Sequence, residues 1–355
     1  MDPRVEELAC ILVDYSTAVR ANDYVVLNVQ TPEATPLLEA LYRLVLQRGA
    51  YPIVRLGFPR QTELYYRHAS EEQLRHFPEL EWQEIQRVSA YIGVGAELNT
   101  RQLTSIDPKR LSLRSKTMEP ILAERLRKRW SVTHYPTNAY AQDADMSLAE
   151  FEDFFFGATN LDWSLESQRQ ERVVAAFDGV REVRVVGADT DLTFSLEGRA
   201  GIKCDGHYNM PDGEVFYAPT ETSAWGHIYY DFPAIVHGKE VLGVRLRFEG
   251  GRVVEASAEK NESLLHEMLA TDEDARLIGE FGIGVNPGIT RFTRDILFDE
   301  KIGGTVHLAL GRAYEESGGL SRSAIHWDMV KDLRAGGEIH VNGELVQKNG
   351  RWAWD

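Results

Sequence analysis

The sequence is poor in cysteine: Cys10 and Cys204 are the two cysteines among 355 residues. They lie far apart in the chain, which excludes the disulfide framework that holds many small secreted domains together. Cys204 and His207 form a C-x-x-H pattern, but structural zinc takes four ligands and no second pair accompanies this one. We therefore expect no structural zinc at Cys204. We expect Cys10, on the apolar side of an amphipathic segment, to be buried.

Long apolar runs are also missing. No run approaches the ~20 residues that span a bilayer, so we expect no membrane partner. The acidic, amphipathic N-terminal segment lacks the cationic stretch and apolar core of a signal peptide, and we expect a cytoplasmic location. Basic residues number 39 against 55 acidic ones, a net charge of −16. This balance excludes broad contact with nucleic acid and favours cations near an acidic site.

Phosphate-binding and serine-nucleophile motifs are missing as well. The chain contains neither a Walker-type loop nor a G-x-S-x-G elbow. Gly93 and Gly95 follow an apolar run, but no third glycine completes a dinucleotide-binding fingerprint. A tight exit from a strand is the better interpretation of these two glycines.

The length of the chain and the periodicity of its apolar residues predict two domains of different texture. Strand, helix and strand in succession indicate a βαβ unit with parallel strands. The first part predicts helices at 4–21, 31–50, 118–130 and 146–158, the last with a Ser147–Glu150 capping box, and buried strands at 24–30, 51–58 and 88–95.

From about residue 182 the chain changes to short alternating strands with glycine turns. Gly250-Gly251 and Asn342-Gly343 predict hairpins. The predicted fold class is α/β: an N-terminal α/β domain with a mainly parallel sheet, residues 1–165, and a C-terminal mixed α+β metal-binding domain, residues 166–355.

The window from Glu280 to Asp328 contains several side chains of the kinds that bind divalent metal ions. His326 and Asp328 are two residues apart, so on a strand both would lie on one face, within reach of one ion or of two neighbouring ions. The alternative is an exposed strand without a metal. His307 lies in the apolar run VHLALG, where a hydrogen-bonded core histidine is the commoner case and a metal ligand is the alternative.

Two carboxylates and a phenol extend this set. Glu280 lies among apolar neighbours, where a carboxylate is costly unless it is paired or bound to metal. Glu214 lies where a turn enters a strand, and an ordinary strand-edge glutamate is its alternative. For Tyr314, a buried, hydrogen-bonded tyrosine is the commoner case. Spacing alone leaves open whether these residues meet in space.

Taken together, these segments resemble the thermophilic aminopeptidase T family of metallopeptidases. The similarity covers most of the chain and is strongest from residue 209 to the end, with several motifs in the same order. The motifs are NMPDGEVFYAP (209–219), RFEGGRVVEASAEK (247–260), EMLATDEDARLIGE (267–280), ILFDEKIGGTVHLALGRAY (296–314), IHWDMV (325–330) and NGRW (349–352).

The resemblance implies a homodimeric aminopeptidase that removes the N-terminal residue of peptide substrates through a metal-bridged water. It implies two divalent ions, and zinc, cobalt or manganese suits a mixed oxygen and nitrogen ligand set. Glu280, as a bridging ligand, and Tyr314, as a hydrogen-bond donor to the oxyanion, are the expected catalytic residues. The residues implied at the metal site are Glu214, Glu280, His307, Tyr314, His326 and Asp328.

Two other functions are compatible with the same scaffold. One is a mononuclear iron ring-opening dioxygenase of the 2,5-dihydroxypyridine type, a relative that keeps the downstream histidines and aspartate but not the full carboxylate set. The other is a degenerate relative with a structural metal. The presence of both Glu214 and Glu280 favours two metals. The segment Glu315–Ile325 is shorter than in the best-known family members, and the sequence identifies no separate general base.

Overall fold

The computed structural model describes residues 2–236 and 238–354. The chain divides into two compact units. The first is Met1–Leu161 with Gly206–Pro211, and the second is Asp162–Asp205 with Asp212–Asp355. A short segment of the first unit therefore interrupts the sequence of the second.

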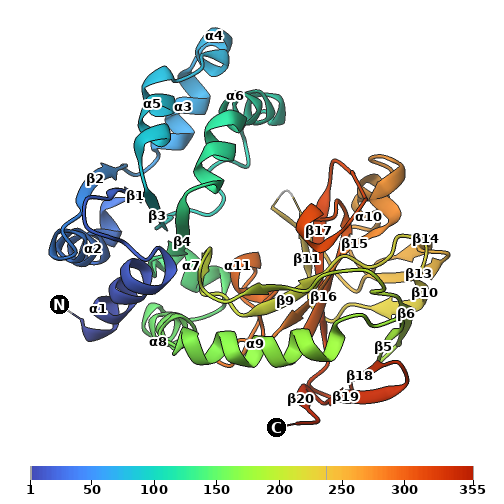
Figure 1. The fold of residues 1–355 in the computed structure, drawn as a ribbon. Helices are drawn as coiled ribbons and strands as arrows, with labels where there is room; N and C mark the ends of the chain where they lie inside the picture. The colour runs from blue at the N-terminus through green and yellow to red at the C-terminus, as the bar shows by residue number, and fades with distance from the viewer. Residues whose placement is uncertain (1, 237, 355) are drawn as a thin grey trace. The chain divides into compact units, whose positions relative to one another are not determined.

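The first unit contains a five-stranded parallel sheet of order β2-β1-β3-β4-β8 (Figure 1). β1 is buried along most of its length, as expected for a strand covered on both faces. The strands are β1 (Tyr24–Val29), β2 (Tyr51–Leu56), β3 (Ala90–Gly95), β4 (Arg129–His134) and β8 (Asn209–Met210). The helices are α1 (Pro3–Cys10), α2 (Thr35–Gln47), α3 (Gln61–His68), α4 (Glu71–Arg75), α5 (Glu79–Arg87), α6 (Pro108–Leu126), α7 (Asn138–Asp143) and α8 (Leu148–Thr159).

Two larger antiparallel sheets form most of the second unit. An eight-stranded sheet has the order β14-β13-β10-β6-β5-β18-β19-β20, and a five-stranded sheet has the order β17-β16-β15-β9-β7. The strands of the eight-stranded sheet are β5 (Val183–Gly187), β6 (Thr190–Phe194), β10 (Trp225–Tyr229), β13 (Arg245–Glu249), β14 (Arg252–Ser257), β18 (Glu338–Val341), β19 (Glu344–Lys348) and β20 (Arg351–Trp352).

The five-stranded sheet of the second unit carries the residues singled out above. Its strands are β7 (Ile202–Cys204), β9 (Glu214–Tyr217), β15 (Ile278–Gly284), β16 (Thr305–Gly311) and β17 (His326–Asp332). A separate hairpin pairs β11 (Ala234–Val236) with β12 (Lys239–Val241). The helices of this unit are α9 (Trp163–Phe177), α10 (Glu262–Leu269) and α11 (Ile296–Asp299).

A single hydrophobic core joins the two larger sheets of the second unit. Phe194 of one sheet and Phe281 of the other meet with ring centroids 4.8 Å apart. α9 contributes Phe177, whose ring lies 6.1 Å from those of both Tyr217 and Phe281. One face of the five-stranded sheet therefore packs against the hydrophobic core, and its other face is available for polar side chains.

The fold class predicted from the sequence is confirmed: the sheet of the first unit is parallel and the second unit mixes helices with antiparallel sheets. The Ser147–Glu150 capping box is present, and both predicted hairpins form. Within the described residues, none of the helices combines the length and the apolar character that a membrane span requires.

Three local predictions were wrong. The first helix does not run to residue 21, because an α-helix ends at Cys10 and a π-helical turn covers Ile11–Ser16. The helix expected at 118–130 begins at Pro108, and residues 129–130 belong to β4. α6 contains no buried residue, so no apolar stripe marked its start. Cys10 is exposed rather than buried.

Candidate metal centre

The candidate centre lies entirely in the second unit, on the polar face of the five-stranded sheet. Side chains alternate along each strand, so residues two apart share a face. In β16, Val306, Leu308 and Leu310 enter the hydrophobic core, whereas His307 lies on the opposite face. The same alternation in β17 sends Trp327 and Met329 into the core and leaves His326 and Asp328 beside His307.

Strand register brings the polar residues together. Asp328, Ala309 and Glu280 are opposite one another on three adjacent strands. On the next strand, Glu214 is opposite Gly284 of β15. Four strands therefore present their polar side chains to one small region, with alanine or glycine between them.

A β-bulge lies directly before Glu280. The register of β15 against β16 shifts between Ile278 and Glu280, leaving Gly279 as the extra residue. Glu280 lies on the polar face by alternation with Phe281, and the bulge lets Ile278, two residues before Glu280, enter the core as well. A side chain at Gly279 would meet the carbonyl oxygen of Arg312 at 2.3 Å, which explains the glycine.

A second glycine makes room for an imidazole. The ring of His307 lies over Gly282, where an added Cβ would be 2.0 Å from His307 Cε1. His307 itself is fully buried. The position of this ring therefore depends on the absence of a side chain on the neighbouring strand.

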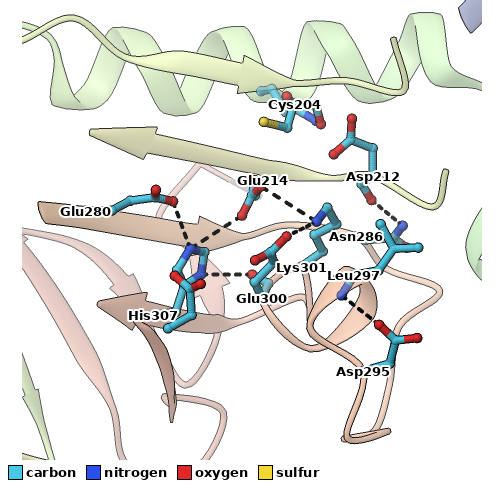
Figure 2. A network of polar contacts seen from close by, with 12 residues as sticks. Cys204, Asp212, Glu214, Glu280, Asn286, Asp295, Leu297, Glu300, Lys301 and His307 are labelled. Atoms are coloured by element: carbon cyan, nitrogen blue, oxygen red, sulfur yellow. Dashed lines mark hydrogen bonds and ion pairs between the residues drawn. The ribbon is translucent and has the colours of Figure 1, made fainter. Parts of the chain in front are cut away.

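The carboxylate of Glu280 lies between two imidazoles. Its Oε1 is 3.1 Å from His307 Nε2, and its Oε2 is 3.5 Å from His326 Nε2 (Figure 2 shows the contact with His307). Two further carboxylates complete the arrangement. Glu214 Oε2 is 3.5 Å from His307 Nε2, and Asp328 Oδ1 is 3.5 Å from His326 Nε2.

Both histidines are oriented by the backbone. His307 Nδ1 lies 3.1 Å from the carbonyl oxygen of Glu300, and His326 Nδ1 lies 2.9 Å from that of Arg312. A carbonyl can only accept, so each Nδ1 carries a proton and donates it. In the neutral ring this leaves the lone pair on Nε2, which is how metal-binding histidines are commonly held.

In this cluster, the buried oxygens Glu214 Oε2 and Asp328 Oδ1 have no hydrogen-bond partner among the described residues. Leaving a buried charged oxygen without a partner is costly. Both atoms face the imidazole nitrogens described above, so the donor set fits divalent metal ions: neutral imidazole nitrogens and carboxylate oxygens that point to a common space.

The pKa values of these groups are shifted because several charged side chains lie close together in a buried space. Burial opposes the charged form of His307, but the hydrogen bond to Glu280 and nearby carboxylates raise its pKa to about 10. The same balance, with Asp328 as the main partner, raises the pKa of His326 to about 9. Burial raises the pKa of Glu214 to about 8, against the charge of Lys301. Burial also acts on Asp328, but its contact with His326 and the nearby positive charges hold its pKa below the usual value.

Tyr314 follows β16 and lies at the edge of the cluster. Its ring centroid is 5.2 Å from that of His326 and 5.3 Å from that of Phe216. Burial, and then the charges of Glu280 and Asp328, raise the pKa of its phenol above the ordinary value. The phenol therefore keeps its proton and can donate a hydrogen bond.

All six residues singled out from the sequence thus lie in or beside one cluster. The sequence analysis missed two others, Glu300 and Lys301, which directly follow α11. The carboxylate of Glu300 is close enough to the carboxylate of Glu214 and the imidazole of His307 to share an ion with them (Figure 2). In the sequence, the adjacent acidic and basic residues of FDEKIGG could have indicated a buried ion pair. Charged residues in a turn are usually solvated, so this interpretation was not favoured.

Cys204 also lies close to the cluster. Its sulfur is near the carboxylates of Asp212 and Glu214. Burial raises the pKa of this thiol well above its usual range, so it is held as a neutral thiol.

Comparison with known proteins gives consistent results. A family model described as Thermophilic metalloprotease (M29) matches residues 1–352. Aminopeptidase 2 of Geobacillus stearothermophilus is 25% identical over an alignment of 380 residues that covers 91% of each chain. Aminopeptidase T of Thermus aquaticus is 35% identical over 202 residues, 47% of each chain.

Two solved structures show the same fold. Wild-type AmpT from Thermus thermophilus superposes over 99% of both chains, with a TM-score of 0.85 and 22% identity. The 2,5-dihydroxypyridine dioxygenase from Pseudomonas putida KT2440 covers 99% of this chain and 97% of its own, with a TM-score of 0.61 and 13% identity. The fold is therefore shared by proteins whose names denote different chemistry.

Proposed function

The chain belongs to the thermophilic metalloprotease (M29) family, and from this premise we propose that it is a metal-dependent aminopeptidase acting on the N-terminal residue of peptides. Relatives that match along nearly the whole chain are named aminopeptidases, which supports this assignment. The observation that carries it is the position of the Glu280 carboxylate, with one oxygen toward His307 and the other toward His326.

We propose that this arrangement holds two divalent ions. Glu280 Oε1, His307 Nε2 and Glu214 Oε2 would hold one, and Glu280 Oε2, His326 Nε2 and Asp328 Oδ1 would hold the other. Each set joins one imidazole, one oxygen of Glu280 and one oxygen that otherwise has no hydrogen-bond partner among the described residues. Zinc, cobalt and manganese are all compatible with such a set.

The ions would supply Lewis acidity toward the peptide carbonyl and lower the pKa of the attacking water. The protein itself positions the groups that would bind the ions. Glu280 fixes the distance between the two ligand sets, and backbone carbonyls fix both imidazoles. Tyr314, as a protonated phenol, would donate a hydrogen bond to the oxyanion that forms at the scissile carbonyl.

The stoichiometry of metal binding separates this proposal from the dioxygenase alternative. Two ligand sets predict about two ions per chain, whereas a mononuclear ring-opening enzyme would bind one. The likeness to the dioxygenase concerns the fold alone. Glu214, with its buried free oxygen, is the residue that favours a second ion.

The test is hydrolysis of an aminoacyl anilide together with metal analysis. We expect release of the amine, its loss with a chelator and its recovery with zinc, cobalt or manganese, at about two ions per chain. Glu280→Gln should reduce both activity and metal content, and the exposed Glu344→Gln serves as the matched control. If Glu280→Gln hydrolysed the anilide at the wild-type rate, the proposed site would not be the active site.

We also propose that the protein is a homodimer, which the family resemblance of the sequence supports. Light scattering coupled to size-exclusion chromatography tests this. A mass near the 40.2 kDa of one chain would contradict it.

A further inference from the structure

Lys301 is a fully buried lysine at the edge of the candidate metal centre. Its side chain is 0% exposed, although lysine is seldom completely buried unless paired. Its Nζ lies 3.7 Å from Glu214 Oε1 and contacts Glu300 Oε1 directly (Figure 2). The ammonium thus lies between two carboxylates, one of which belongs to the proposed ligand set.

The backbone around Lys301 is fixed on both sides. Its amide donates to the carbonyl of Phe298, and its carbonyl accepts from the amide of Asn286. Two residues earlier, Asp299 accepts hydrogen bonds from both the amide and the hydroxyl of Thr293. Because these hydrogen bonds fix the backbone, the Lys301 side chain starts from a defined position and its ammonium is held in one place.

The two oxygens of Glu214 have different surroundings. Oε1 faces the ammonium of Lys301, whereas Oε2 faces His307 and has no hydrogen-bond partner among the described residues. A carboxylate attracted through one oxygen cannot turn freely, so the other oxygen stays directed into the centre. The positive charge also offsets part of the repulsion between Glu214 and Glu300, both of which pair with Lys301.

From this geometry we propose that Lys301 is a positioning residue of the metal centre, which holds Glu214 Oε1 and thereby presents Glu214 Oε2 to the ion shared with His307. Glu300 acts on the site of the same ion through two of its groups. Its side chain holds the ammonium of Lys301, and its backbone carbonyl accepts from Nδ1 of His307. The inference rests on the proposed two-ion function, because it requires Glu214 to be a ligand.

Lys301→Met tests the inference, because it keeps the length of the side chain and removes its charge. Calorimetric titration of the chelator-treated full chain with zinc should show the affinity for one of two ions reduced by about 10- to 100-fold, the usual effect of losing a residue that orients a ligand. The affinity for the second ion should change much less. Denaturation in the presence of chelator reports folding separately.

Lys331→Met is the matched control. Lys331 is 1% exposed, lies in the same unit, and pairs with Asp231 and with the carbonyl of Ala188 instead of with a proposed ligand. Its loss should lower stability and leave both zinc affinities within about two-fold of the wild-type values. A comparable loss of zinc affinity in both variants would mean that removing any buried lysine disturbs the centre, and would overturn the inference.

A double-mutant cycle with Glu214→Gln distinguishes positioning from general damage. If Lys301 acts through Glu214, then Lys301→Met should have little further effect on zinc affinity in the Glu214→Gln background. Independent, multiplying effects would contradict the proposal. Should Lys301→Met fail to fold, Glu300→Gln replaces it and should weaken the same ion in the same Glu214-dependent manner.

The outcomes separate this inference from the proposed function. A wild-type chain that binds one ion or none refutes the two-ion function itself. A wild-type chain that binds two ions, together with a folded Lys301→Met that binds both unchanged, refutes the role of Lys301 alone.

Discussion

At the scale of the residue, Tyr314 has the least determined role, because a phenol can be a metal ligand or a hydrogen-bond donor. It lies beside His326 but is 45% exposed, unlike the buried carboxylates. Its raised pKa favours the protonated form. A protonated phenol is a donor, which is compatible with the proposed role in stabilising an oxyanion.

Tyr314→Phe should therefore lower kcat for anilide hydrolysis by about 10²- to 10³-fold, the usual effect of removing one oxyanion donor, while leaving the metal content at the wild-type level. Steady-state kinetics and elemental analysis measure the two quantities. Tyr42→Phe, at a position 43% exposed, is the control. Loss of metal in Tyr314→Phe would instead identify the phenol as a ligand.

Replacing Gly282 tests whether the position of the His307 ring controls zinc binding. We expect Gly282→Ala to displace the imidazole, because the new Cβ would lie 2.0 Å from His307 Cε1, and to weaken zinc binding by more than about ten-fold. Calorimetric titration measures the affinity. Gly157→Ala is the control: it lies in α8 with no atom within 4 Å of an added Cβ, and should stabilise the helix by about 0.5–1 kcal/mol.

At the scale of the element, the bulge in β15 is the decisive feature. It lets Ile278 and Phe281 enter the core while Glu280, between them, faces the opposite side. The bulge also places Gly279 against the carbonyl of Arg312, the group that accepts from Nδ1 of His326. The irregularity of one strand therefore lies next to one proposed ligand, Glu280, and against the carbonyl that orients another proposed ligand, His326 on β17.

Gly279→Ala is expected to disturb both at once. The added Cβ would lie 2.3 Å from the oxygen of Arg312, so either the bulge opens or that carbonyl moves away from His326. Zinc affinity should fall about 10- to 100-fold, and stability should fall as well, as measured by calorimetric titration and by chemical denaturation. Unchanged affinity for zinc would mean that the bulge does not govern the centre.

At the scale of the whole molecule, the pKa shifts link the metal centre to stability. His307, with a pKa of about 10, and His326, with a pKa of about 9, are both raised above the ordinary 6.5. A raised pKa stabilises the folded state fully below the unfolded value and loses this effect as the pH rises through the folded value. Glu214, raised from 4.5 to about 8, acts in the same direction at lower pH.

The metal-free protein should therefore lose stability between about pH 6.5 and about pH 10. Its Tm in the presence of a chelator should fall across this range. Zinc binding displaces the same protons, so the rise in Tm caused by zinc should grow over the same range. The lowered pKa of Asp328 acts only below its ordinary value of 3.8, outside this window. A metal-free Tm that rises with pH would contradict these charge assignments.

The sequence was sufficient for much of this protein, and the reasons are local. Alternation of apolar and polar residues in VHLALG and HWDMV determines which side chains share a face, since residues two apart in a regular strand do. The Ser147–Glu150 capping box and the Asn342-Gly343 turn follow from hydrogen bonding over a few residues. For the same reason, an exposed element without an apolar stripe, such as α6, was placed incorrectly.

Tertiary structure alone decided the rest. Glu280 lies on the same face as His307 because β15 pairs with β16 in a register that puts Gly282 opposite His307, and a register depends on the partner strand. Lys301 looks like an ordinary charged turn residue in the sequence, and it acquires a role because the fold buries it between Glu214 and Glu300. The sequence determined which side chains were available, whereas pairing between distant strands determined which of them meet.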